Sequence, residues 1–154
     1  MTAATLREAE DETFRCLSHY TRCIDAKDWP ALDRVFAPDC VKERLGLDGL
    51  SGEVAVTGGQ AIIDDIAAAL GRCGPTQHLL GNHVLTRLEG DEAESRTYVR
   101  AFHRGAGDKS ELWFEVMGEY VVGWRRQSEG WRVRKWALRI VSSLGDPRAV
   151  APGA

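Results

Sequence analysis

The sequence lacks the features that mark membrane-spanning and secreted proteins. Its 154 residues contain no uninterrupted apolar run of about 18 residues, which argues against a membrane-spanning helix. The N-terminal segment does not have the basic-then-apolar order of a secretory signal and is acidic instead, with Glu8, Glu10, Asp11 and Glu12. We therefore expect a cytoplasmic protein that does not bind membranes.

Cysteine is scarce and widely spread. No two of the four cysteines form a Cys-x-x-Cys pair, and zinc sites and disulfide frameworks need closely and regularly spaced cysteines. We therefore predict reduced, mostly buried thiols that behave as small apolar side chains: Cys16, Cys23, Cys40 and Cys73.

What is present suits one globular domain. Hydrophobic residues make up 44% of the chain, too many for a disordered protein, and the length allows a sizeable core. No internal repeat or linker is visible. We expect a single domain over residues 1–145 and a flexible tail over residues 146–154, which contains two prolines and one glycine.

Charge is divided unevenly along the chain. Residues 1–95 hold 9 basic and 17 acidic side chains, whereas residues 96–139 hold 10 basic and 5 acidic ones. A basic half is one mark of nucleic-acid binding. Here arginines and glutamates recur at even spacing instead, as on the polar sides of adjacent strands: Arg96, Arg100, Arg104, Glu111, Glu115 and Glu119. We expect no nucleic-acid partner.

Three helices are predicted. Apolar residues at helical spacing indicate an amphipathic helix over residues 6–26, a stretch without proline or glycine. A second, short helix is expected to begin at Asp28-Trp29-Pro30 and to end before Pro38. An apolar stripe with the same spacing predicts a third helix over residues 60–70.

The remaining segments predict strands. Short strands are expected at residues 40–45 and 54–57, around a turn at residues 47–52. Four longer segments follow, separated by glycine-containing hairpin turns: residues 76–88, 93–104, 112–127 and 131–143. The sequence therefore predicts an α+β fold, with three N-terminal helices packed in one long, curved, mainly antiparallel sheet.

Two histidines on neighbouring predicted strands are candidate site residues. Strict alternation along residues 76–85 places His78 and Asn82 on one face and His83 on the other. His103, on the next strand, shares its face with small and apolar residues, which is typical of a cavity or core. A single histidine is more often a structural residue, but two together with Asn82 favour a site.

Asp25 and Tyr20 flank the buried stripe of the first predicted helix. At about 100° per residue, each lies about 70° to one side of that stripe, which is formed by Phe14, Leu17, Thr21 and Ile24. Taken alone, Asp25 could be a surface residue and Tyr20 a core residue. A carboxylate that accepts the Nδ1 proton of a histidine, however, fixes the tautomer and makes the other nitrogen a better base.

Several motifs occur along the chain in a characteristic order: Tyr20 with Asp25, Asp28-Trp29-Pro30-Ala31-Leu32, Gly58-Gly59-Gln60-Ala61-Ile62, Gln77-His78, Asn82-His83, Gly90-Asp91 and Gly130-Trp131-Arg132. In this order they resemble the SnoaL-like branch of the nuclear-transport-factor-2-like (NTF2-like) superfamily, over nearly the whole chain. The resemblance implies a cone-shaped fold with a ligand pocket at its wide end. Because this fold carries many activities, the resemblance does not name a substrate.

Within the superfamily, the sequence is most similar to the dehydratase-like group, which includes scytalone dehydratase, bile-acid dehydratases and hexachlorocyclohexane dehydrochlorinase. Asp25 and His78 match the catalytic Asp–His dyad of that group. Tyr20 matches a tyrosine of the bile-acid enzymes, and His103 matches a second histidine of scytalone dehydratase. The sequence departs from scytalone dehydratase at Ile24, where that enzyme has tyrosine, and from the dehydrochlorinase, which has lysine at the position of Tyr20.

The resemblance implies a cofactor-independent lyase of the dehydratase type, or a related proton-transfer enzyme. The substrate would be a cyclic, largely apolar polyketide-, terpenoid- or steroid-like small molecule. His78 would remove a carbon-bound proton and Asp25 would stabilise the resulting imidazolium. Tyr20 and His103 would bind a carbonyl or protonate the leaving hydroxyl. Further residues are expected to place the substrate: Asn82, Arg139, Phe36, Leu80, Val99 and Phe114.

Three alternatives remain open. A SnoaL-type polyketide cyclase or epoxide-opening cyclase of natural-product biosynthesis would need a carboxylic acid in the pocket, which Glu115 or Glu119 could supply. A non-catalytic ligand-binding or assembly module would need no dyad. His78, His103 and Asp25 could also hold a metal ion, but the resemblance favours acid–base chemistry without one.

Large aromatic residues also predict self-association. We expect the outer face of the sheet to carry several of the tryptophans of the long strands, more than one chain can cover: Trp113, Trp124, Trp131 and Trp136. The sequence therefore predicts a homo-oligomer, a dimer or a trimer, formed through the sheet.

Overall fold

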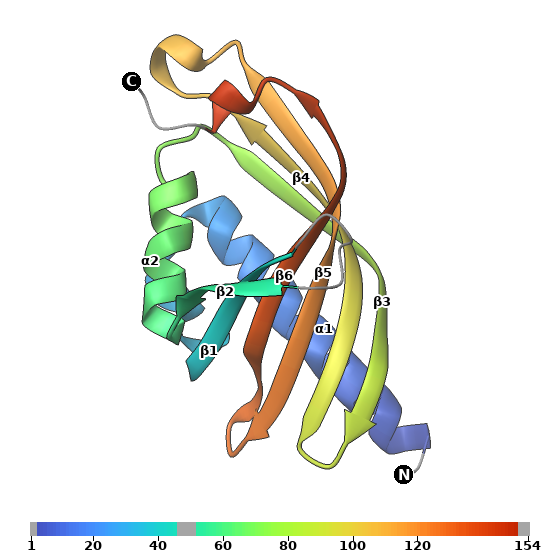
Figure 1. The fold of residues 1–154 in the computed structure, drawn as a ribbon. Helices are drawn as coiled ribbons and strands as arrows, with labels where there is room; N and C mark the ends of the chain where they lie inside the picture. Colours follow the sequence, from blue (N-terminus) through green and yellow to red (C-terminus); the bar gives the residue numbers. More distant parts are fainter. Residues whose placement is uncertain (1–2, 46–51, 151–154) are drawn as a thin grey trace.

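In the part of the chain that the structure describes, six strands form one curved sheet, and two α-helices lie against its concave face (Figure 1). The computed structural model describes residues 3–45 and 52–150. Within these residues no helix is both long and apolar enough to cross a membrane. The elements are α1 (Ala3–Ala26), β1 (Phe36–Leu45), β2 (Gly52–Thr57), α2 (Gly59–Leu70), β3 (Thr76–Glu89), β4 (Glu92–Arg104), β5 (Trp113–Gln127) and β6 (Gly130–Gly145).

The strand order is β2-β1-β6-β5-β4-β3. β1 and β6 run parallel, and every other neighbouring pair is antiparallel. Gly90 and Gly130 adopt positive φ angles of 59° and 114° in two of the hairpin turns, a conformation that glycine adopts without steric cost. The predicted curved, mainly antiparallel sheet is confirmed. Helix α1 crosses its concave face diagonally, and α2 stands beside β1 (Figure 1).

The prediction of three α-helices is wrong, because the second one is a short 3₁₀ helix. It spans only Pro30–Arg34. Phe36 already belongs to β1 and pairs with Val133 of β6, so the chain becomes extended four residues earlier than expected. Between Pro30 and Phe36 there is too little chain for an α-helix of ordinary length.

Strict alternation along β3 also fails, at a β-bulge. The register with β4 shifts between Gly81 and Val84, and Asn82 has a φ of 50°. An extra residue in one strand moves every later side chain to the other face. The bulge therefore turns His83 to the concave side, where His78 also lies, and leaves Asn82 exposed. The predicted placement of Asn82 and His83 is wrong for this reason.

Three of the four tryptophans predicted for the outer face lie in the core. Trp124, Trp131 and Trp136 are 1%, 6% and 4% exposed, and the Trp124 Nε1–H donates to Ser95 Oγ at 2.8 Å. Their large rings fill the space between the sheet and the helices. Trp113 alone of the four is at the surface, where its ring stacks on Phe102 at a centroid distance of 6.4 Å.

The segments expected to be a turn and a tail are described in part. Of the predicted turn at residues 47–52, all but Gly52 lie outside the described residues, as do residues 151–154 of the tail. Residues Pro147–Ala149 form a 3₁₀ helix, with Asp146 accepting from the Arg148 backbone N–H and Ala149 3% exposed. The division into a domain and a flexible tail stays a prediction.

The bulge makes a specific prediction for stability. A β-branched residue at a positive φ is strained by about 1–2 kcal/mol, whereas asparagine and glycine tolerate this conformation. Asn82→Val should therefore lower the free energy of unfolding by about that amount, and Asn82→Gly should change it by less than about 1 kcal/mol. Urea denaturation of both variants checks this. An Asn82→Val variant as stable as Asn82→Gly would contradict the assigned conformation.

Candidate active site

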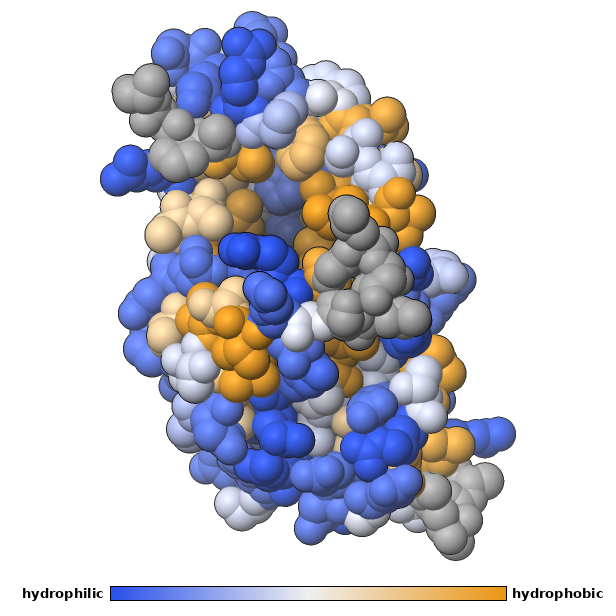
Figure 2. Space-filling view, viewed as in Figure 1, coloured by the Kyte–Doolittle hydropathy of each residue, from blue (hydrophilic) through white to orange (hydrophobic). Residues whose placement is uncertain are grey.

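A cavity of about 210 Å³ lies between α2 and the concave face of the sheet. Figure 2 shows the surface hollowed at this place, with hydrophobic residues around the hollow. Most of the cavity wall is apolar or aromatic, and the polar groups come from two histidines, two tyrosines and a lysine. The lining residues are Tyr20, Lys42, Ile66, Ala69, Leu70, His78, Val99, Ala101, His103, Val116, Tyr120, Trp136 and Leu138.

His78 and Asp25 form the predicted contact. The His78 Nδ1–H donates to Asp25 Oδ1 at 2.7 Å, and the His78 backbone N–H donates to Oδ2 at 3.0 Å. Nδ1 must carry the proton here because a carboxylate only accepts. His78 lines the cavity with a side chain that is 4% exposed, while Asp25 lies behind it, outside the lining. In the neutral ring, the proton on Nδ1 leaves Nε2 of His78 as the nitrogen that can accept from a ligand.

Asp25 sits where a carboxylate is locally unfavourable. It is in the last turn of α1, next to the negative end of the helix dipole. The Thr76 hydroxyl also donates to its Oδ1, at 2.8 Å. Burial would raise the pKa of Asp25, but the hydrogen bonds from His78 and Thr76 outweigh burial and hold that pKa below its ordinary value. Asp25 is thus an anion held in place by three donors from β3.

His103 lies beside His78 and is a hydrogen-bond acceptor toward the cavity. The two rings are perpendicular, with centroids 5.5 Å apart. His103 Nδ1 donates to the Phe114 carbonyl at 3.1 Å, which leaves Nε2 without a proton in the neutral ring. Burial lowers the pKa of His103, so the ring is neutral near pH 7. His103 Nε2 can accept a hydrogen bond from a substrate hydroxyl, but the neutral ring is poorly suited to the expected role of proton donor.

Tyr20 lies in the cavity wall as expected, and it is paired with Tyr120. Their rings meet edge to face with centroids 5.9 Å apart, and their hydroxyls interact. Burial raises the pKa of both tyrosines, and the charge of Asp25 raises that of Tyr120 further. Both hydroxyls therefore remain protonated, and with Tyr20 donating to Tyr120 the Tyr120 hydroxyl is the donor left for the cavity that His78 also lines.

Val99 alone of the four apolar residues predicted for substrate binding lines the cavity. Phe36 lies behind the wall, in edge-to-face contact with Tyr20 and Trp136. Leu80 and Phe114 pack against the core without lining the cavity. The sequence pattern could not distinguish a cavity wall from the layer of side chains behind it.

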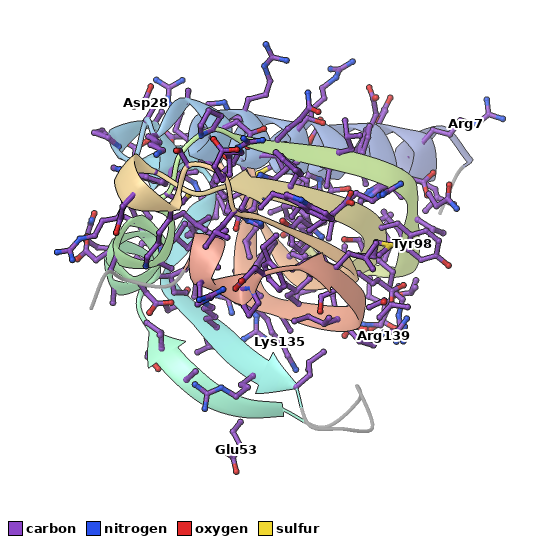
Figure 3. The ribbon with its side chains drawn as sticks, turned by 90° about the horizontal axis from the view of Figure 1, so that it is seen from above. Arg7, Asp28, Glu53, Tyr98, Lys135 and Arg139 are labelled. Carbon is purple, nitrogen blue, oxygen red and sulfur yellow. The ribbon has the colours of Figure 1, made fainter. Side chains whose placement is uncertain are left out.

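Asn82 and Arg139, the two predicted polar substrate residues, do not lie in the cavity. Asn82 lines a separate, open depression beside the first half of α1 because of the bulge. Arg139 points outward from the convex face of the sheet, as does Tyr98 (Figure 3). Its guanidinium donates to Glu119 Oε2 at 2.8 and 3.0 Å.

Glu115 and Glu119 are also on the convex face. Arg100 Nη2 lies 2.8 Å from Glu115 Oε1, and Arg96 Nη1 lies 3.3 Å from Glu119 Oε2. On each strand these residues alternate with cavity residues, as the pairing of Val116 with Ala101 on the inner face shows. Neither glutamate can act as an acid inside the cavity.

Sequence reasoning missed several residues of this region, among them Tyr120, Lys42 and Thr76. Tyr120 and Lys42 line the cavity, and Thr76 holds Asp25. Tyr120 lies four residues after Val116 on one strand, so both side chains point to the same, inner face. This alternation could have been read from the predicted strand. No sequence pattern indicated Lys42, because the strand predicted over residues 40–45 is short. Its pairing with Trp136 of β6 could not be predicted either.

The cysteines play no part in the cavity wall. All four are free, and Cys23, Cys40 and Cys73 are buried, as predicted. Burial raises the pKa of Cys16 and Cys40 to about 12, so these thiols stay protonated and unreactive. Within residues 3–45 and 52–150, no three histidine, cysteine or acidic side chains are grouped so that they could hold a metal ion.

Known proteins share this fold. A family model described as a SnoaL-like domain matches residues 7–137. An uncharacterized protein of Mycobacterium tuberculosis is 30% identical over 122 residues, 79% of this chain and 78% of that protein. A provisionally assigned aromatic ring hydroxylase of Novosphingobium aromaticivorans has a TM-score of 0.77 and 25% identity, over 94% of this chain and 97% of its own.

A provisionally assigned scytalone dehydratase of the same organism also has a TM-score of 0.77. It is 22% identical, and the match covers 95% of this chain and 92% of the other. At that identity the likeness shows the fold alone. The structural similarities confirm the NTF2-like α+β architecture with its curved sheet.

The buried histidines predict how stability depends on pH. Burial lowers the pKa of both His83 and His103 below the ordinary value of 6.5. His83 is neutral between two hydroxyls, Thr13 at 3.0 Å and Thr97 at 2.7 Å, while Glu10 partly opposes the shift. As pH falls through about 6.5, the unfolded chain binds protons that the folded chain does not.

The free energy of unfolding should therefore fall between pH 7.5 and 5.5, by at most about 1.4 kcal/mol per pH unit for each histidine. Urea denaturation across this range measures the slope. His83→Gln removes one of the two titrating groups, so its slope should be shallower than that of the wild type. A stability that stays constant or rises toward pH 5.5 would show that the pKa directions are wrong.

Proposed function

The chain belongs to the SnoaL-like family, as its motifs predicted, and we propose that it is a cofactor-independent lyase of the dehydratase type or a closely related proton-transfer enzyme. The observation that supports this most directly is the 2.7 Å hydrogen bond between His78 Nδ1 and Asp25 Oδ1, with His78 in the cavity wall and Asp25 behind it. This is the arrangement of a general base and the group that positions it.

In the proposed reaction, His78 Nε2 takes a proton from a substrate carbon that is made acidic by a neighbouring carbonyl. The positive charge that forms on the imidazole is stabilised by Asp25. A positioned general base of this kind contributes about 10²- to 10⁴-fold to the rate. Asp25 does not line the cavity, so its role is to position His78 and not to touch the substrate.

The electrons of the broken C–H bond form a C=C bond as the C–O bond to the hydroxyl breaks. The departing hydroxyl can take the proton that His78 has just accepted, so that water leaves and the histidine returns to its neutral state. Tyr120, supported by Tyr20, is placed to donate to the carbonyl oxygen as negative charge develops there. His103 Nε2 is placed to accept from the substrate hydroxyl.

The cavity favours a small substrate. Its volume of about 210 Å³ is somewhat larger than an engineered cavity of about 150 Å³ that holds benzene. It is below the range of about 300–1,000 Å³ that is typical of sites for larger ligands. Of the substrate classes expected from the sequence, one- or two-ring polyketide- or terpenoid-like molecules fit, and a steroid-like molecule would have to extend through the mouth.

The positions of the glutamates weaken the cyclase alternative. The acid that such an enzyme needs was expected from Glu115 or Glu119, and both are paired with arginines on the convex face. A ligand-binding module without catalysis would not need the Asp25 carboxylate behind His78, held there by three hydrogen bonds from His78 and Thr76. We therefore favour the lyase.

We also propose that the protein associates with itself through the convex face of the sheet. Apart from Trp113, large apolar side chains exposed on this face include Leu79, Val84, Tyr98 and Leu144. They lie among the ion pairs of Glu115 and Glu119, a mixed surface that suits a contact between subunits. Whether the assembly is a dimer or a trimer stays open.

The lyase proposal predicts the effect of four variants on turnover. In an assay of cyclic β-hydroxy ketones and polyketide intermediates that follows loss of water, His78→Ala should lower kcat/KM by about 10²- to 10⁴-fold. Asp25→Asn should lower it by at least about 10-fold, because an amide does not stabilise the imidazolium. Glu115→Gln and Arg139→Gln, both on the convex face, are the controls and should keep near wild-type activity.

Retained turnover in His78→Ala would overturn the mechanism. Loss of activity in Glu115→Gln with retention in His78→Ala would favour the cyclase. If wild type and all variants bind the same ligands without turnover, the protein is a binding module.

A further inference from the structure

Lys42 is the single lysine or arginine among the described residues that line the cavity. Lys42 lies opposite Trp136 in the parallel pairing of β1 with β6, and Trp136 is a cavity residue, so both side chains point to the concave face. The preceding and following residues of β1, Val41 and Glu43, lie on the other side of the strand, where Glu43 pairs with Lys135 at 3.0 Å. A lysine among the mostly apolar and aromatic residues of this wall needs an explanation.

Its ion pair with α2 is an incomplete explanation. Lys42 Nζ lies 2.6 Å from Asp65 Oδ2, and the two side chains are 30% and 45% exposed. An ion pair this accessible to water contributes little to stability, typically about 0–1 kcal/mol. Its partner is therefore readily exchanged for another anion. Apolar side chains on β1 and α2 would join the two elements equally well.

The position of Lys42 relative to the dyad is informative. His78 is on β3 and Lys42 is on β1, so β4, β5 and β6 lie between their strands. Both side chains nevertheless line the same cavity, because the sheet curves around it. The polar groups of the cavity are thus divided between a base on one side and a cation on the other, with Trp136, Leu138 and Val116 among the apolar residues of the wall.

We propose that Lys42 binds a carboxylate of the substrate, which takes the place of Asp65 on the ammonium group. The substrate class is then a one- or two-ring hydroxy or oxo acid, whose acidified C–H faces His78 and whose carboxylate faces Lys42. Asp65 holds the ammonium in position while the site is empty, and it competes with the ligand for it. The proposal rests on the lyase assignment for the identity of the site, but the binding it describes does not require turnover.

Binding of sodium benzoate to the full chain tests the proposal, with benzyl alcohol as the uncharged probe of the same size. Titrations followed by nuclear magnetic resonance give Kd for each. Lys42→Gln should weaken benzoate binding at least about fivefold, which is about 1 kcal/mol, and leave benzyl alcohol unchanged. Asp65→Asn should tighten benzoate binding, because it removes the competing anion.

Lys135→Gln is the matched control, since Lys135 is on the neighbouring strand, faces outward and is also paired with a carboxylate (Figure 3). It should not change the affinity for benzoate. Thermal unfolding of each variant shows that it is folded. The opposite effects of Lys42→Gln and Asp65→Asn distinguish an anion site from a merely structural ion pair, for which both variants would act in the same direction.

Three results would overturn the anion site: equal affinity for benzoate in wild type and Lys42→Gln, weaker binding in Asp65→Asn, or no saturable benzoate binding up to about 20 mM. These results leave the lyase assignment intact if His78→Ala still abolishes turnover. Conversely, Lys42-dependent benzoate binding with full turnover in His78→Ala would uphold the anion site and reject the lyase.

Discussion

The hydrogen bond between Asp25 and His78 joins α1 to β3, and the proposed chemistry depends on it. It places a carboxylate at the end of a helix where the dipole disfavours negative charge, and three donors from Thr76 and His78 compensate for that cost. It also fixes the tautomer of His78, so that the nitrogen facing the cavity is unprotonated. One contact between distant segments thus sets both the geometry of the site and the tautomer of its histidine.

The sequence predicted the parts of the structure that follow from local periodicity. Helix α1, the hairpins of β3 to β6 and the facing of Asp25 toward His78 all follow from patterns within one element or from the order of the motifs. The bulge at Asn82 could not be predicted, because asparagine is also compatible with a regular strand and the twist that requires a bulge arises from the whole sheet. The exposed position of Asn82 follows from that bulge.

The two faces of the sheet have different physical roles. On the concave face, aromatic rings such as Tyr20, Tyr120 and Trp136 enclose a small cavity in which few polar groups remain, so each of them acts in a poorly hydrated environment. On the convex face, glutamates and arginines neutralise one another, and two arginines cover the buried carboxylate of Glu119. Part of the basic charge of residues 96–139 is used there, because Arg96 and Arg139 pair with Glu119 and Arg100 pairs with Glu115.

If His78 is a general base inside this cavity, it should remove carbon-bound protons from a bound ketone. Hydrogen–deuterium exchange at those carbons measures this activity directly. With 2-tetralone in D2O, a base in the cavity should catalyse the exchange of the α-hydrogens for deuterium, which nuclear magnetic resonance follows without any need for elimination. The wild-type protein should accelerate this exchange over buffer, and His78→Ala should abolish the acceleration. Equal exchange rates with wild type and His78→Ala would contradict the role of His78 as the base.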